Sequence, residues 1–130
     1  MADEIVLVDT SILIDFYRKS NKDNSAWMKL ALQQYDFAIS VVTKYEIYSG
    51  ATQSQLNFWN NKIGNAKIFV LDERTIDKAV EINNGLKKTS NQNAIADLFI
   101  AATALTHNLP LATLNLKHFN RVQNLKILEP

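Results

Sequence analysis

Four residues with oxygen-bearing side chains stand at positions where each could take part in metal chemistry: Asp9, Glu46, Asp97 and Asn115. Asp9 directly follows the apolar run EIVLV at residues 4–8, and Asn115 comes just after the apolar run LPLAT at residues 109–113. Carboxylate and amide oxygens are the ligands that hard cations such as Mg²⁺ and Mn²⁺ take in proteins. The pattern indicates an oxygen-lined cation site if the fold brings these side chains together.

Each of these residues also has an ordinary structural explanation when it is taken alone. Asp9 could cap the helix that follows it, although Thr10 and Ser11 could do so as well. An acid such as Asp97 in the first turn of a helix is favoured by the helix dipole. Steps of three and four residues from Asp97 lead, however, along an apolar stripe that begins at Ile100, so Asp97 is expected to face the buried side. An unpaired buried carboxylate is costly, so Asp97 is expected to be neutralised, hydrogen-bonded or bound to a metal.

The segments that must position these residues read as strands alternating with helices. The expected strands are 4–8, 37–42, 67–71, 109–113 and 126–129. The expected helices are 10–19, 24–35, 43–50, 53–64, 94–106 and a short one at 116–120. A further, long helix is expected to begin after Asp72, with Ile76, Ala79 and Val80 on its buried face. A polar loop is expected at 89–93. This alternation predicts an α/β fold in which a mostly parallel sheet of four to five strands is flanked by helices in three layers. The carboxyl ends of parallel strands meet at one edge, where ligands bind.

The composition of the chain limits the kinds of catalytic site, metal site and partner that it can have. The chain has 130 residues, which fits a single domain spanning 1–130, and its formal net charge of +1 neither supports nor excludes a nucleic-acid partner. The sequence contains no cysteine, which excludes thiolate catalysis and cysteine-bound zinc. Only two histidines are present, His107 and His118, and both are expected at the surface. No apolar run is long enough to span a bilayer and no signal peptide is evident, so a cytoplasmic location is expected.

Four segments in order, at suitable spacing, carry a family resemblance. They are VLVDTSILID around Asp9, ISVVTKYEIYSG around Glu46, ADLFIAATAL around Asp97 and LPLATLNLKHF around Asn115. The whole chain resembles the PIN domain family, and within it the VapC-type toxin ribonucleases of type II toxin–antitoxin pairs. No single segment is specific to this family, and the resemblance depends on all four together.

The resemblance implies a divalent-metal-dependent endoribonuclease that hydrolyses RNA phosphodiester bonds and acts as a toxin. It implies Mg²⁺ or Mn²⁺ as cofactor, an RNA substrate, an antitoxin protein as partner and a homodimer, with no membrane. The catalytic positions it implies are Asp9, Glu46, Asp97 and Asn115, with Asp9, Asp97 and Glu46 as metal ligands and with Ser11 and Thr113 as hydroxyls that support the carboxylates. Many relatives have aspartate where this chain has Asn115, which leaves open whether one or two ions bind.

Two other functions compete with this one. A phosphoacceptor domain also has an aspartate after its first strand, but VDTSIL lacks the paired aspartates that such a site needs. A catalytically weakened PIN-like module that only binds RNA or protein stays open because of Asn115. Basic residues close to the matching segments could contact an RNA backbone: Arg18, Lys19, Lys44, Lys117 and Arg121.

Overall fold

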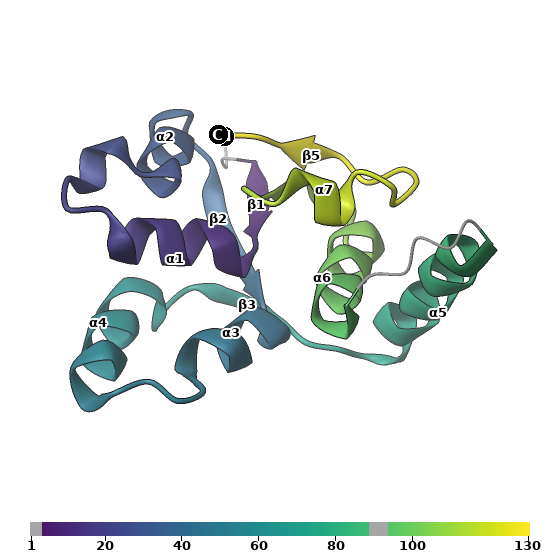
Figure 1. The fold of residues 1–130 in the computed structure, drawn as a ribbon, viewed down its shortest axis with the longest axis horizontal. Helices are drawn as coiled ribbons and strands as arrows, with labels where there is room; N and C mark the ends of the chain where they lie inside the picture. The colour runs from purple at the N-terminus through teal and green to yellow at the C-terminus, as the bar shows by residue number, and fades with distance from the viewer. Residues whose placement is uncertain (1–3, 89–93) are drawn as a thin grey trace.

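A computed structural model describes residues 4–88 and 94–130 and shows five parallel strands flanked by helices (Figure 1). The strands are β1 (Ile5–Val8), β2 (Asp36–Ser40), β3 (Lys67–Phe69), β4 (Leu111–Ala112) and β5 (Ile127–Leu128). The helices are α1 (Thr10–Arg18), η1 (Lys22–Asn24, a 3₁₀ turn), α2 (Ala26–Leu32), α3 (Val41–Tyr48), α4 (Gln53–Ile63), α5 (Glu73–Lys88), α6 (Ile95–Thr106) and α7 (Leu116–Phe119). The predicted α/β fold is confirmed. The predicted polar loop at 89–93 lies outside the described residues.

The strand order places the chain's first strand at the centre of the sheet. The order is β3-β2-β1-β4-β5, and every neighbouring pair is parallel. The chain moves outward from β1 through β2 to β3, and then returns to place β4 on the other side of β1. The order of the strands therefore reverses between β1 and β4, and the carboxyl ends of strands at such a reversal are where open α/β sheets bind ligands.

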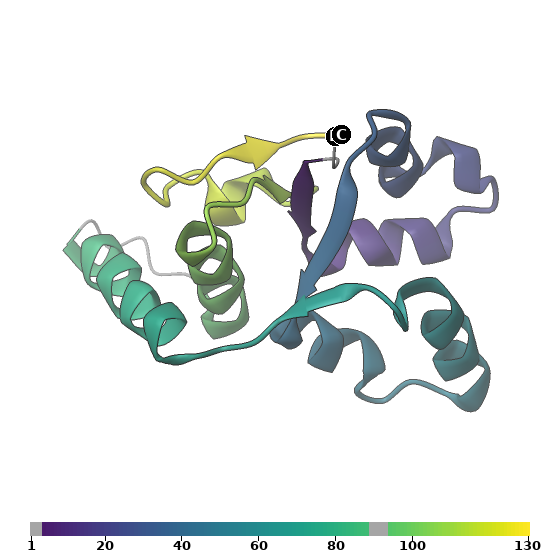
Figure 2. The ribbon, with the colours of Figure 1, turned by 180° about the vertical axis from the view of Figure 1, so that it is seen from behind.

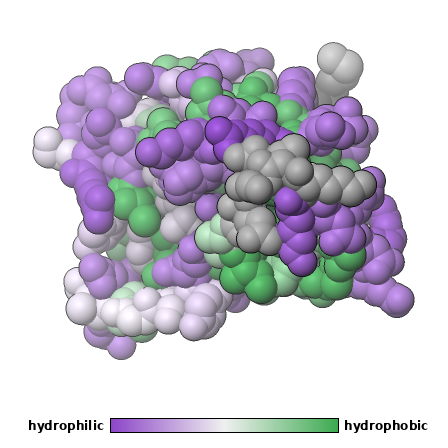
Figure 3. Space-filling model, turned by 45° about the vertical axis from the view of Figure 1, so that its right-hand side comes forward, coloured by the Kyte–Doolittle hydropathy of each residue, from purple (hydrophilic) through white to green (hydrophobic). Residues whose placement is uncertain are grey.

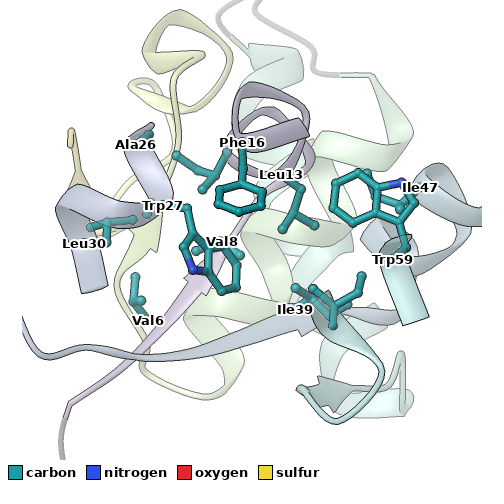
Figure 4. Close-up of a cluster of buried hydrophobic side chains, with 13 residues drawn as sticks. Val6, Val8, Leu13, Phe16, Ala26, Trp27, Leu30, Ile39, Ile47 and Trp59 are labelled. Carbon is teal, nitrogen blue, oxygen red and sulfur yellow. The ribbon is translucent and has the colours of Figure 1, made fainter. Parts of the chain in front are cut away.

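Alternating residues of β1 point into two different helical layers. Val6 and Val8 pack with α1, α2 and α4 on one face, while Leu7 packs with α6 and α7 on the other. On the first face Phe16, Trp27 and Trp59 gather over the strand residues (Figure 4). Both faces of the sheet are covered, which explains why β1 reads as a continuous apolar run. Figure 2 shows α5 lying outside α6, away from the sheet.

The boundary between β2 and α3 differs from the prediction. The sequence predicts a strand at 37–42 because Val41 and Val42 are β-branched, but the strand ends at Ser40 and α3 begins at Val41. The Ser40 hydroxyl accepts a hydrogen bond from the Val42 backbone N–H at 3.0 Å and caps the helix. An N-terminal cap therefore overrides the strand propensity of two residues here.

The buried face of α5 was also predicted wrongly. Ala79 is buried as expected, but Ile76 and Val80 are 37% and 54% exposed. The buried positions are instead Thr75, Ala79 and Leu86, because the main contact of α5 is with α6 and covers a narrow strip. The side of the molecule that carries α5 comes forward in Figure 3, where apolar residues show among hydrophilic ones. The expected cap at the start of this helix is confirmed, since Asp72 accepts from the Thr75 N–H at 2.9 Å.

None of the helices within residues 4–88 and 94–130 is long and apolar enough to cross a membrane.

A buried hydroxyl in α3 yields the first prediction. Thr43 is fully buried, and among the described residues its hydroxyl has no hydrogen-bond partner. Thr43→Val removes this unpaired group at nearly constant volume, so the free energy of unfolding in urea is expected to stay the same or rise by about 1 kcal/mol. The matched control is Thr103→Val, because the equally buried Thr103 hydroxyl donates to the Phe99 carbonyl at 2.7 Å. The control should lose about 1 kcal/mol, and an equal loss in Thr43→Val would contradict the assignment.

Candidate active site

Asp9 lies at the carboxyl end of β1, beside β4, and is 3% exposed. Both of its carboxylate oxygens accept hydrogen bonds. Oδ1 accepts from the Ser11 hydroxyl at 2.5 Å and from the Ile12 backbone N–H at 3.3 Å, and Oδ2 accepts from the Thr113 hydroxyl at 2.6 Å. Its own N–H donates to the Ala112 carbonyl at 3.1 Å, which ties it to β4.

The hydroxyls that hold Asp9 are themselves oriented by the loop after β4. The Ser11 hydroxyl accepts from the Leu114 N–H at 3.0 Å, and the Thr113 hydroxyl accepts from the Asn115 N–H at 2.9 Å. Because each hydroxyl oxygen already receives a backbone N–H, its single proton is free to point at Asp9. The loop backbone thus fixes two donors on one buried carboxylate.

Burial raises the pKa of the Asp9 carboxyl above its ordinary value, and the hydrogen bonds from Ser11 and Thr113 offset part of that rise. Desolvation is the larger of the two effects, because Asp9 has no cationic side chain bonded to it in the described structure. A divalent cation beside Asp9 would stabilise the charged form that burial disfavours.

Asp9 also caps α1, a role that the sequence leaves open to Asp9, Thr10 or Ser11. Its side chain accepts from Ile12, the third residue of the helix, at the position where a capping oxygen is needed. Thr10 and Ser11 occupy the first two helical positions, from which their hydroxyls turn to neighbouring acids instead. Asp9 therefore caps the helix while it also lines the cavity, so the capping role does not exclude a role as a ligand.

Glu46 reaches the site from α3, which follows β2 directly. It is exposed, and its Oε1 accepts from the Thr10 hydroxyl at 2.5 Å. This bond joins the start of α1 to the last turns of α3. The helices that follow the neighbouring strands β1 and β2 are therefore linked at the same edge of the sheet.

Asp97 lies in the first turn of α6, with its side chain 26% exposed. The apolar stripe predicted to run from it is confirmed, since Ile100, Ala101 and Ala104 are buried. Oδ2 of Asp97 lies 3.2 Å from Nδ1 of His118, which comes from α7.

One open cavity of about 660 Å³ joins these groups at the carboxyl ends of the strands. The residues that line it are Asp9, Thr10, Ser11, Ile14, Asp15, Arg18, Lys19, Glu46, Asp97, Ile100, Leu114, Asn115 and His118. All four predicted catalytic residues are among them, and so are Ser11 and two of the five basic residues. Thr113 lies behind Asp9 and is fully buried. Asn115 occupies the N-cap position of α7 but makes no side-chain cap bond, so its amide remains available.

The donor set suits a hard divalent cation. Three carboxylates and an amide offer oxygen ligands, and the buried Asp9 lacks a cationic partner. Within the described ranges, however, no three acidic or histidine side chains come together closely enough to hold an ion as they stand. The reason is that each acid turns to its own hydrogen-bond donor: Asp9 to hydroxyls, Glu46 to Thr10 and Asp97 to His118. A cation would compete with these donors.

His118 was not expected in the site, because a histidine on a short helix is usually a surface residue. The signal that could have found it is its spacing from Asn115, since residues three apart lie on the same side of a helix. The remaining acid of the cavity, Asp15, has a structural role. It accepts from the Ala26 N–H at 2.8 Å at the start of α2, and it pairs with Lys19 at 3.5 Å.

Comparisons with known proteins agree with this geometry. The family model of the PIN domain matches residues 6–125. Ribonuclease VapC1 of Methanocaldococcus jannaschii is 34% identical over 122 residues, which cover 91% of this chain and 81% of that protein. Ribonuclease VapC10 of Mycobacterium tuberculosis is 29% identical over 123 residues, covering 94% and 91% of the two chains.

Solved structures share the fold. VapBC-1 from nontypeable Haemophilus influenzae superposes with a TM-score of 0.83 at 22% identity, over 96% of this chain and 97% of that one. A toxin–antitoxin complex from Klebsiella pneumoniae gives a TM-score of 0.75 at 26% identity, with the same coverage. The family model spans nearly the whole chain, and the residues that line the cavity, apart from Arg18 and Lys19, come from the same four segments that carried the resemblance. The chain belongs to the PIN domain family.

Proposed function

We propose that this chain is a divalent-metal-dependent endoribonuclease that hydrolyses RNA phosphodiester bonds and serves as the toxin of a toxin–antitoxin pair. The observation that carries the proposal is the buried Asp9 carboxylate, fixed by two hydroxyls at the point where the strand order reverses, with Glu46 and Asp97 around the same cavity. Relatives that bear the name ribonuclease VapC support the same activity.

In the proposed reaction Asp9 and Asp97 hold the cation, and Glu46 either joins them or orients the attacking water. A bound Mg²⁺ or Mn²⁺ supplies an acidified water and neutralises charge on the phosphodiester. Asn115 positions the cation or the water through its amide oxygen. No side-chain nucleophile is required, which agrees with a chain that contains no cysteine.

Two cationic residues, Arg18 and Lys19, lie at the rim of the cavity. Arg18 and Lys19 end α1, and the helix rises about 1.5 Å per residue, so they lie roughly 13 Å along the helix from Asp9. We propose that they contact RNA phosphates on one side of the bond that is cut, because lysine and arginine near a nuclease site bind the backbone without reading sequence.

An antitoxin and a second copy of the chain are the proposed protein partners. Solved structures that share the fold include a toxin–antitoxin complex from Klebsiella pneumoniae. An aromatic surface on α1 and α4 could receive an antitoxin segment, since Tyr17 is 38% exposed and stacks on Trp59 with ring centres 5.6 Å apart. The exposed Val80 on α5 and Val70 before it offer apolar area to a homodimer.

Asp9→Asn is expected to lower Mn²⁺-dependent cleavage of RNA about 100-fold or more, because it removes the charge of a ligand without changing the shape of the side chain. The fold should persist, since asparagine caps helices as well as aspartate does. Asp72→Asn is the matched control, because it makes the same change at the cap of α5, on a residue that does not line the cavity. Cleavage that survives in Asp9→Asn, or that EDTA leaves unaffected, would contradict a metal-dependent nuclease site at Asp9. Absence of cleavage by the unaltered chain would favour the binding-module alternative.

The stability of the metal-free protein should depend on pH through Asp9. A carboxyl whose pKa is raised by folding stabilises the fold fully below its ordinary pKa of 3.8, and this contribution is lost as the pH rises through the folded value. In EDTA, urea unfolding should therefore show Asp9→Asn gaining stability relative to the unaltered chain as the pH rises from about 3 to neutrality. Hydrogen bonds from Thr75 lower the pKa of Asp72, so Asp72→Asn should show the opposite trend. Parallel trends in the two variants would contradict the assignment.

Thr113→Val removes the hydroxyl that donates to Asp9 Oδ2 and receives the Asn115 N–H. Cleavage is expected to fall about 10- to 100-fold, as when other groups that orient metal ligands are lost. Thr113→Ser keeps the hydroxyl and should retain most of the activity, even though it also loses a buried methyl group. If the serine variant is as impaired as the valine variant, packing rather than the hydroxyl accounts for the loss.

A further inference from the structure

His118 is the one group with a nitrogen lone pair among the described residues that line the cavity. Its Nδ1 lies 3.2 Å from Oδ2 of Asp97, and its side chain is 45% exposed. Every other donor that could bind a cation there offers oxygen, and the basic residues Arg18 and Lys19 offer only N–H groups.

The position of the imidazole is fixed by its neighbours in α7. Phe119, the next residue, is fully buried against the core that α6 shares with the sheet, which holds the short helix down. His118 follows Asn115 by three residues, so the two side chains lie on the same side of α7, and both line the cavity.

The contact with Asp97 has the spacing of two ligands of one ion. Donor atoms on neighbouring corners of an octahedral shell with a radius of about 2.1 Å lie about 3.0 Å apart. The separation of 3.2 Å therefore allows Nδ1 and Oδ2 to bind the same cation with little movement. The same distance also fits a hydrogen bond between the two side chains.

Imidazole nitrogen changes which cation such a site prefers. Oxygen donors suit Mg²⁺, whereas a nitrogen donor adds affinity for later divalent ions and adds little for Mg²⁺. A cavity lined by carboxylates alone would not discriminate in this way.

We propose that His118 is a nitrogen ligand beside Asp97 and that it gives this site a preference for Mn²⁺ over Mg²⁺. The inference rests on the proposed function only in that a divalent cation binds at the acidic cluster. It assigns to His118 a place in the coordination shell rather than a role in proton transfer.

Pulsed electron paramagnetic resonance tests the inference directly, with Mn²⁺ alone added to the full chain and no RNA present. A histidine nitrogen bound to Mn²⁺ gives a ¹⁴N modulation, which should be present in the unaltered chain and absent in His118→Asn. The chain has one other histidine, His107, whose ring lies 4.4 Å from that of Phe69 and does not line the cavity. His107→Asn is the matched control and should keep the modulation. Modulation that persists in His118→Asn would overturn the inference.

Calorimetric titration of each ion gives a second readout. The ratio of Mn²⁺ to Mg²⁺ affinity should fall about tenfold in His118→Asn and stay unchanged in His107→Asn. An equal loss for both ions would mean that His118 only holds Asp97 in place, and this would overturn the inference. Mn²⁺ that binds the unaltered chain without nitrogen modulation overturns the inference and leaves the proposed function standing. Failure of Mn²⁺ to bind at all overturns both.

Discussion

The buried carboxylate of Asp9 is the constraint on which the site depends. It is almost without solvent contact, and it is stabilised by hydroxyl protons rather than by a cationic side chain. Those protons point at Asp9 because the backbone N–H groups of Leu114 and Asn115 occupy the hydroxyl oxygens from the other side. The loop after β4 therefore determines the charge environment of a residue more than 100 positions earlier in the chain.

The order of the strands makes this arrangement possible. Because β1 pairs with β4 on one side and with β2 on the other, the segments that follow all three strands meet at one edge of the sheet. Asp9 arrives from the first segment, Glu46 from the helix after β2, and Thr113 from the segment after β4. The helix α6 then adds Asp97 from the layer that covers the sheet behind them. Each acid is paired with a separate hydrogen-bonding group, and this pairing keeps the three carboxylates apart.

Much of this could be predicted from the sequence, because it depends on short-range patterns. The apolar runs before Asp9 and Thr113 mark buried parallel strands, and parallel strands place their carboxyl ends together. The stripe that runs from Asp97 fixes the inner face of α6 through helical periodicity alone. These features need no knowledge of which strand lies beside which.

What escaped prediction depends on partners far away in the sequence. Ile76 and Val80 look like a buried stripe, but α5 packs mainly on α6, and no pattern within α5 reveals how narrow that contact is. The contact of His118 with Asp97 joins α7 to α6 and cannot be read from either helix alone. Asp9 appeared to be either a cap or a ligand, whereas the same carboxylate can accept an N–H from α1 and still face the cavity.

The most direct measurement of the central claim is anomalous diffraction from crystals of the chain soaked in Mn²⁺. The account predicts an anomalous peak within bonding distance, about 2.2 Å, of carboxylate oxygens of both Asp9 and Asp97. A peak that avoids Asp9, or the absence of any peak in this cavity at saturating Mn²⁺, would contradict it.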